Sequence, residues 1–140
     1  MFPYGSVCKG SLKIKLPMML AAGLTAITAI AHVFGGTPEF MGPILESNAP
    51  DFNKTGMTII WHWVTAVLCI NAVVLFIAGR DNQDMRAAIW ILILQFLSFG
   101  VIFAGFGLAT FASLFVMPQW IAFFLISALA YYGLRANAKA

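Results

Sequence analysis

Charged residues are scarce in this sequence, and three long stretches contain no aspartate, glutamate, lysine or arginine. These stretches cover residues 16–38, 55–79 and 87–134. Only 9% of the 140 residues are charged, against about 25% in a typical soluble domain. So few charges cannot cover a water-exposed surface, and we therefore expect the chain to form one membrane domain over residues 1–140.

Other residue types that would mark a known chemistry are also scarce. The only two cysteines, Cys8 and Cys69, lie in different parts of the chain, and no Cys-x-x-C motif or Gly-rich phosphate loop is present. The net charge is +3, but the basic residues sit at the ends of apolar segments rather than over one face. This distribution does not suit nucleic acid as a partner.

The apolar segments predict an all-α fold. A helix needs about 20 mostly apolar residues to cross a bilayer, and the third stretch is long enough for two such helices. We expect four transmembrane helices at about 16–34, 57–79, 87–109 and 114–134, in an up-down-up-down four-helix bundle. Pro118 also allows the last helix to begin near Met117, because proline is favoured in a first helical turn.

Seven of the eight basic residues fall on one side of this four-span arrangement. They are Lys9, Lys13, Lys15, Arg80, Arg86, Arg135 and Lys139. The outer connection, residues 35–56, carries Lys54 with Glu39, Glu46 and Asp51. By the positive-inside rule, both termini are cytoplasmic, and we expect a bacterial inner membrane. The competing interpretation of the N-terminus is a signal peptide ending near Ala31, but we expect the first helix to be retained.

Polar residues recur at helical spacing within each predicted span. The stripes are Thr25, Thr28 and His32; Thr58, His62, Thr65 and Cys69; Gln95, Ser98 and Gly105; and Gln119, Ser127 and Tyr131. Because polar side chains avoid lipid, we expect these faces to turn inward. Their simplest role is to hold the helices together through hydrogen bonds.

The only two histidines, His32 and His62, fall at similar depth near the outer membrane face. Ionisable residues within membrane spans are expensive and mark functional sites by default. Gln119 and Met117 are expected at a similar level. The amphipathic segment 39–46 would lie above them as a lid, so that Glu39 or Glu46 could reach the imidazoles.

Four interpretations of this pair compete. The histidines could be structural, each hydrogen-bonded to a neighbour. They could hold a transition metal together with Glu39 or Glu46, since imidazole and carboxylate are its usual ligands. They could be the two axial ligands of haem b. Finally, a quinone, lipid or other small ligand could lie against His62, Gln119, Trp61 and Trp63.

The sequence thus favours a small integral membrane protein without a recognisable catalytic apparatus. We expect an accessory or ligand-binding subunit with an outward-facing pocket around His32 and His62. One alternative is a metal- or haem-binding redox or enzyme component that uses the same histidines. Another is a purely structural subunit of a larger membrane complex. The expected partners are the lipid bilayer and other membrane subunits or further copies of the chain.

Overall fold

The computed structural model describes residues 15–80 and 84–137, and that part of the chain is helical without strands. Its elements are α1 (Leu16–Ala31), a π-helix η1 (His32–Met41), α2 (Gly42–Glu46), α3 (Asp51–Arg80), α4 (Arg86–Phe111) and α5 (Gln119–Asn137). The all-α prediction is confirmed. Cys8 and the basic residues at positions 9, 13 and 139 lie outside the described residues.

In the part of the chain that the structure describes, three helices are long and apolar enough to cross a membrane. They are the continuous helix Leu16–Glu46, with 31 residues, α3, with 30 residues, and α4, with 26 residues. The fourth helix, α5, has 19 residues. It begins at Gln119, later than the expected position 114 and close to the alternative start near Met117.

The segment expected as the outer connection, residues 35–56, is mostly helical. α1 runs without interruption into η1 and α2, so only residues 47–50 join Glu46 to Asp51. Pro38 lies inside η1. In an α-helix, a proline ring clashes with the carbonyl group four residues earlier. The wider π-helical turn, with hydrogen bonds between residues five apart, moves that carbonyl group and accommodates the ring.

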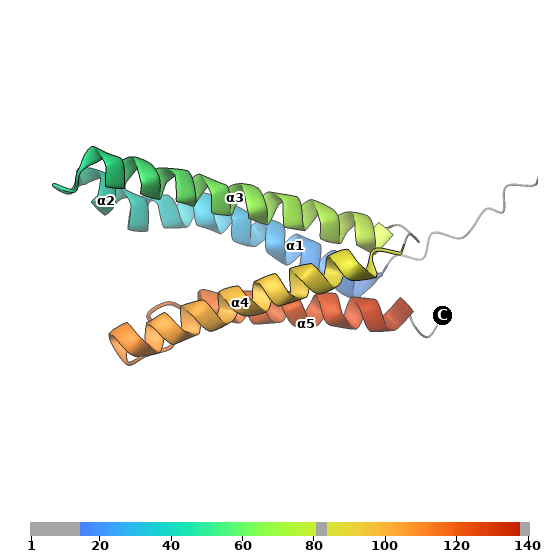
Figure 1. Ribbon diagram of the computed structural model, residues 1–140. Helices are drawn as coiled ribbons and strands as arrows, with labels where there is room; N and C mark the ends of the chain where they lie inside the picture. The colour runs from blue at the N-terminus through green and yellow to red at the C-terminus, as the bar shows by residue number, and fades with distance from the viewer. Residues whose placement is uncertain (1–14, 81–83, 138–140) are drawn as a thin grey trace, which may run out of the picture.

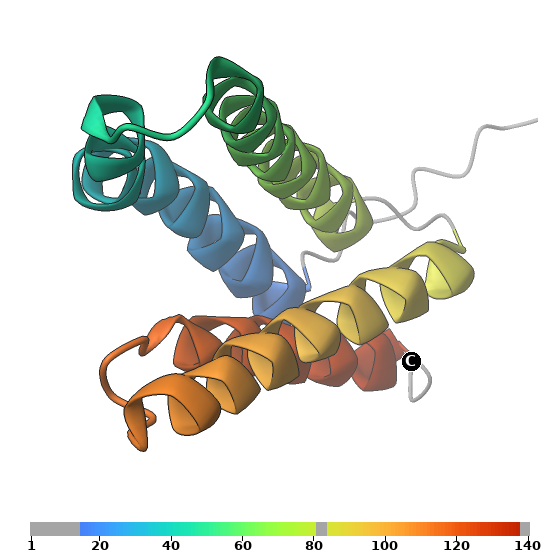
Figure 2. The same cartoon turned by 60° about the vertical axis from the view of Figure 1, so that its left-hand side comes forward.

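Successive long helices alternate in direction and form two antiparallel pairs (Figure 1). The first pair is α1–η1–α2 with α3, and the second is α4 with α5. α1 also packs on α5, so it joins the two pairs, whereas α3 and α4 make only a slight contact. The pairs diverge toward the α2 end, as Figure 2 shows. Among the described residues, the four long helices therefore form an arrangement that is open between α3 and α4.

Two adjacent methionines give α1 its central place. A Cβ atom on Gly133 of α5 would lie 2.9 Å from the terminal methyl carbon of Met18, and one on Gly79 of α3 would lie 2.8 Å from the sulfur of Met19. The missing side chains let both helices approach α1 closely. The N–H of Lys15 also donates a hydrogen bond to the carbonyl oxygen of Gly79 at 3.0 Å. These contacts fasten the beginning of α1 to both neighbours.

The second pair is held by aromatic packing over another glycine. Phe96 is fully buried and stacks on Phe123, with their ring centroids 6.1 Å apart. A Cβ on Gly100 would lie 2.9 Å from a ring carbon of Phe124. Small residues at helix crossings allow such close approach.

Most of the predicted polar stripes do not link helices. Thr25, Thr28, Thr58 and Ser98 each donate to a carbonyl oxygen four residues earlier in their own helix. Such local bonds satisfy a hydroxyl group without a partner helix. The exceptions are Ser127, whose hydroxyl group also reaches the carbonyl oxygen of Ile93, Gln95, whose Oε1 accepts from the side-chain amide of Asn71 at 3.3 Å, and His32, whose Nε2 lies 3.2 Å from the carbonyl oxygen of Trp61.

The Asn71–Gln95 bond connects α3 to α4, and Asn71 is only 5% exposed. It belongs to the buried face of α3, which also includes Leu68, Leu75 and Ala78. That face, and not the stripe of Thr58, His62, Thr65 and Cys69, turns inward. Cys69 and His62 are exposed.

Candidate functional site

Trp61 is the centre of an aromatic cluster between η1 and α3. Its ring stacks on the imidazole of His32, with centroids 3.9 Å apart and 20° between the planes. The ring of Phe40 lies at 6.2 Å on η1. Trp61 lies about 20 residues before Arg80, the number that crosses a hydrocarbon core. Tryptophan at such a spacing is typical of membrane interfaces.

The π-helical segment is shaped to receive this indole. A Cβ atom on Gly36 would lie 2.9 Å from two carbons of the Trp61 ring, so glycine is needed for the ring to lie there. The Trp61 Nε1–H donates to Thr37 Oγ1 at 3.0 Å. Stacking, close approach and a hydrogen bond together hold η1 against α3. This packing explains why a segment containing Gly35, Gly36 and Pro38 is helical.

The polar atoms of His32 are also used within the cluster. Its Nε2 lies 3.2 Å from the carbonyl oxygen of Trp61, which can only accept, so His32 carries its proton on Nε2 and donates. The hydroxyl group of Thr65 donates to the same oxygen at 3.2 Å. His32 thus has a stacked ring face and an engaged nitrogen. This geometry fits the structural interpretation of His32.

His62 lies on a different face of α3, and the expectation that both imidazoles turn inward is wrong for it. Its side chain is exposed. Successive residues of an α-helix point about 100° apart because a turn takes about 3.6 residues. Since Trp61 faces η1, the next residue must point away from it. The two histidines therefore do not share one pocket.

The remaining residues of the expected metal and ligand sites are dispersed. Glu39 and Glu46 are exposed, as is Trp63, at 68%. Within residues 15–80 and 84–135, no three His, Cys, Asp or Glu side chains are grouped so that they could hold a metal ion. The donor geometry gives no support to the metal site, or to haem b between the two histidines.

Gln119 and Met117 lie at the turn between α4 and α5, away from the contact between η1 and α3. Gln119 is the first residue of α5, and its Oε1 is buried without a hydrogen-bond donor. The neighbouring Trp120 donates its Nε1–H to the carbonyl oxygen of Leu114 at 2.9 Å. This hydrogen bond belongs to the turn between α4 and α5, and neither Gln119 nor Trp120 is part of the Trp61 cluster.

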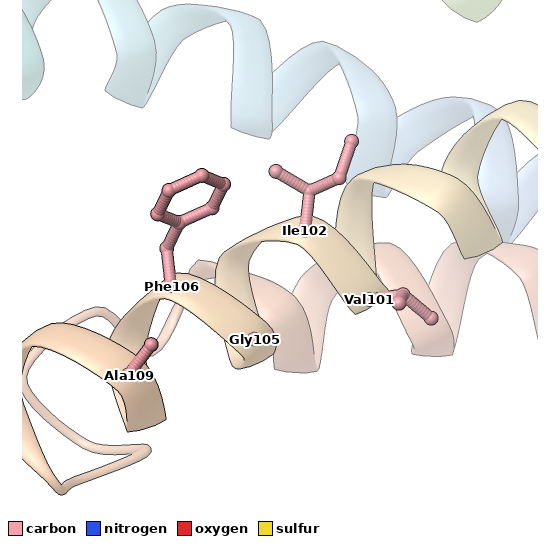
Figure 3. A pocket seen from close by; sticks show the side chains of 5 residues that line it. All are labelled: Val101, Ile102, Gly105, Phe106 and Ala109. Carbon is pink, nitrogen blue, oxygen red and sulfur yellow. The ribbon is translucent and has the colours of Figure 1, made fainter.

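A feature that sequence reasoning missed is an open groove on the C-terminal half of α4. It has a volume of about 240 Å³ and is lined by Val101, Ile102, Gly105, Phe106 and Ala109. Figure 3 shows Ile102 and Phe106 projecting from the same side of the helix, with Gly105 between them. A Cβ on Gly105 would meet nothing within 4 Å. The glycine therefore forms an unfilled notch in the surface of α4.

The spacing of Gly105 and Ala109 was the signal for this groove. Small residues four positions apart mark faces where transmembrane helices pack closely. Gly105, which was expected on an inward polar stripe, is exposed. Comparison of the chain with protein-family models, with curated proteins and with solved structures gives no match.

Proposed function

We propose that this chain is a small integral membrane protein of four spans, with both termini in the cytoplasm of a bacterial inner membrane. Three apolar helices of sufficient length support the membrane setting. The fourth helix, α5, has 19 residues and a length of about 28 Å, close to the thickness of a hydrocarbon core. The basic residues Lys15, Arg80, Arg86 and Arg135 lie at the helix ends that would face the cytoplasm.

Within that membrane, we propose that the protein is an accessory subunit that binds a transmembrane helix of a partner protein. The observation that carries this proposal is the groove over Gly105. Its lining is apolar, and the notch allows another helix backbone to approach α4. The open side of the molecule supports the same function, because α3 and α4 make only a slight contact and leave that half of α4 exposed.

A helix fits this groove better than a chemical substrate does. The lining contains neither an ionisable side chain nor a hydroxyl group, so it offers no group that could orient or react with a polar molecule. Ile102 and Phe106 flank Gly105, with Ala109 one turn further along. This arrangement of small and large side chains is typical of the holes that receive side chains of a neighbouring helix.

The alternatives drawn from the sequence receive less support. A redox or metal-dependent component would use His32, His62 and a carboxylate, but one imidazole is covered by Trp61 and the other points away. A ligand pocket between the histidines would need the same convergence. The open groove on α4 therefore favours an interaction subunit over both.

Site-specific photocrosslinking in intact cells tests this function. A benzophenone amino acid replaces Phe106, which lines the groove, or Leu125, which is 49% exposed on α5 and serves as the control. We expect adducts of position 106 with an apolar segment of another membrane protein, identified by peptide mass spectrometry. Position 125 should react with lipid alone. Lipid adducts alone at both positions, or adducts only with a second copy of this chain, would contradict the proposal.

A further inference from the structure

The cytoplasmic ends of α4 and α5 carry a second feature, a pair of arginines beside an aromatic contact. Trp90 of α4 and Tyr131 of α5 meet edge to face, with ring centroids 5.9 Å apart. The guanidinium carbon of Arg135 lies 5.0 Å from the centroid of the Tyr131 ring. Tyr132 adjoins Tyr131 at 6.1 Å and is 63% exposed.

Arg86 lies on the α4 side of the same contact. It precedes Trp90 by four residues, and residues four apart share one face of a helix. Tyr131 and Arg135 have the same spacing on α5. Because Trp90 and Tyr131 touch, Arg86 and Arg135 flank one seam between the two helices. Both arginines are exposed at the end of the molecule where α4 begins and α5 ends.

The charges around this seam leave the arginines available to an anion. The nearest described carboxylate in the sequence is Asp84, and its Oδ1 accepts the backbone N–H of Arg86 at 3.1 Å. Within residues 15–80 and 84–135, neither Arg86 nor Arg135 forms an ion pair with a carboxylate. Two guanidinium groups can each bind phosphate oxygens through paired N–H donors.

We propose that the Arg86–Arg135 seam binds the phosphate headgroup of an anionic phospholipid in the cytoplasmic leaflet. The guanidinium groups would hold the phosphate, while the exposed indole of Trp90 and the ring of Tyr132 lie at the level of the ester groups, as aromatic residues do at membrane interfaces. Juxtamembrane basic residues attract anionic lipid. The proposal rests on the proposed membrane orientation but not on the partner helix at the α4 groove.

The chain provides a matched control for this proposal in Arg80. Its guanidinium group also lies over an aromatic ring of its own helix, 5.4 Å from the centroid of Phe76, but Arg80 belongs to α3 and not to the contact between α4 and α5. Arg80→Gln removes the same charge as Arg86→Gln or Arg135→Gln. It therefore separates binding at the seam from general attraction of anionic lipid to a basic protein end.

The test is native mass spectrometry of the full chain released from lipid nanodiscs that contain equal amounts of phosphatidylcholine and phosphatidylglycerol. We expect the wild-type protein to retain phosphatidylglycerol preferentially, and Arg86→Gln and Arg135→Gln each to lower the phosphatidylglycerol-bound fraction about fivefold. Arg80→Gln should leave that fraction nearly unchanged. Helix content measured in the same nanodiscs shows whether each variant is folded.

Two results would overturn the proposal. One is equal retention of the two lipids by the wild-type protein, and the other is an equal loss of phosphatidylglycerol in Arg80→Gln. Failure of the protein to enter nanodiscs made of phosphatidylcholine alone would instead count against the membrane setting itself. The two failures are therefore distinguishable.

Discussion

The indole of Trp61 lies flat on the imidazole of His32, with 3.9 Å between the ring centroids. Trp61 is on α3 and His32 begins the π-helix η1, so the stack joins these two elements. The same indole fits against Gly36, and its Nε1–H donates to Thr37 Oγ1. The contact explains at once why η1 is helical and why His32 is not free to bind a ligand with His62.

Removal of the indole should destabilise the packing of η1 against α3. We expect Trp61→Ala to lower the free energy of unfolding by about 3 kcal/mol, the lower end of the range for such truncations, because Trp61 is only partly buried. Trp63→Ala, two residues further and 68% exposed, should change it by less than about 0.5 kcal/mol. Unfolding in detergent micelles, followed by circular dichroism, measures both. Equal losses of stability in the two variants would show that Trp61 does not hold η1 against α3.

Adjacent glycines in η1 should respond in opposite directions to a single methyl group. Gly36→Ala places a Cβ 2.9 Å from the Trp61 ring, and we expect a loss of about 1–3 kcal/mol from overpacking. Gly35→Ala meets nothing within 4 Å. It should leave stability unchanged or raise it by up to about 1 kcal/mol, because alanine favours helical backbone. The same unfolding measurement decides, and a stable Gly36→Ala protein would contradict the described fit.

The hydrogen bond between Asn71 and Gln95 should couple α3 to α4. In a double-mutant cycle of Asn71→Ala and Gln95→Ala, we expect a coupling energy of about 0.6 kcal/mol, the average for hydrogen bonds between membrane helices. Ser98→Ala is the control, since the hydroxyl group of Ser98 donates within its own helix. Absence of coupling in the first cycle, or equal coupling of Asn71 with Ser98, would argue against this link.

The end of α4 contains a residue in an unfavourable backbone conformation. Ala112 has φ = 51° and follows the last helical residue. A side chain in this left-handed region costs about 1–2 kcal/mol. We expect Ala112→Gly to raise stability by about 0.5–1 kcal/mol after the greater freedom of glycine in the unfolded chain is subtracted. Ala128→Gly, inside α5, should lower stability by about 1 kcal/mol. A loss in both variants would contradict the backbone conformation at Ala112.

The helical class of the protein could be predicted from the sequence because long uncharged stretches leave few other folds for a chain in lipid. The helix between Gly35 and Glu46 could not be predicted in this way. Its glycines and Pro38 locally favour a turn, and the packing of Trp61, which comes from a distant part of the chain, overrides that preference. Local spacing contains no information about such a contact.

The inward face of α3 could not be predicted for a related reason. His62, Thr65 and Cys69 form a regular polar stripe, and this polarity predicts that their face turns inward. The inward face of α3 instead follows Leu68, Asn71 and Leu75, because shape and apolar packing against α1 decide it. Only the spacing of Gly105 and Ala109 indicates the groove on α4. The rule that polar residues mark inward faces assigns Gly105 to the stripe of Gln95 and Ser98 instead.

The proposal that a partner helix lies in the α4 groove is tested most directly by photocrosslinking from position 106 in a protein that also carries Gly105→Leu. Leucine fills the notch, and it should not harm the helix because it is a better helix former than glycine by about 0.8–1 kcal/mol. We expect the adducts with the partner's transmembrane segment to disappear, while the protein remains in the membrane with unchanged helix content. Adducts formed at the same yield after Gly105→Leu would contradict a helix seated in the α4 groove.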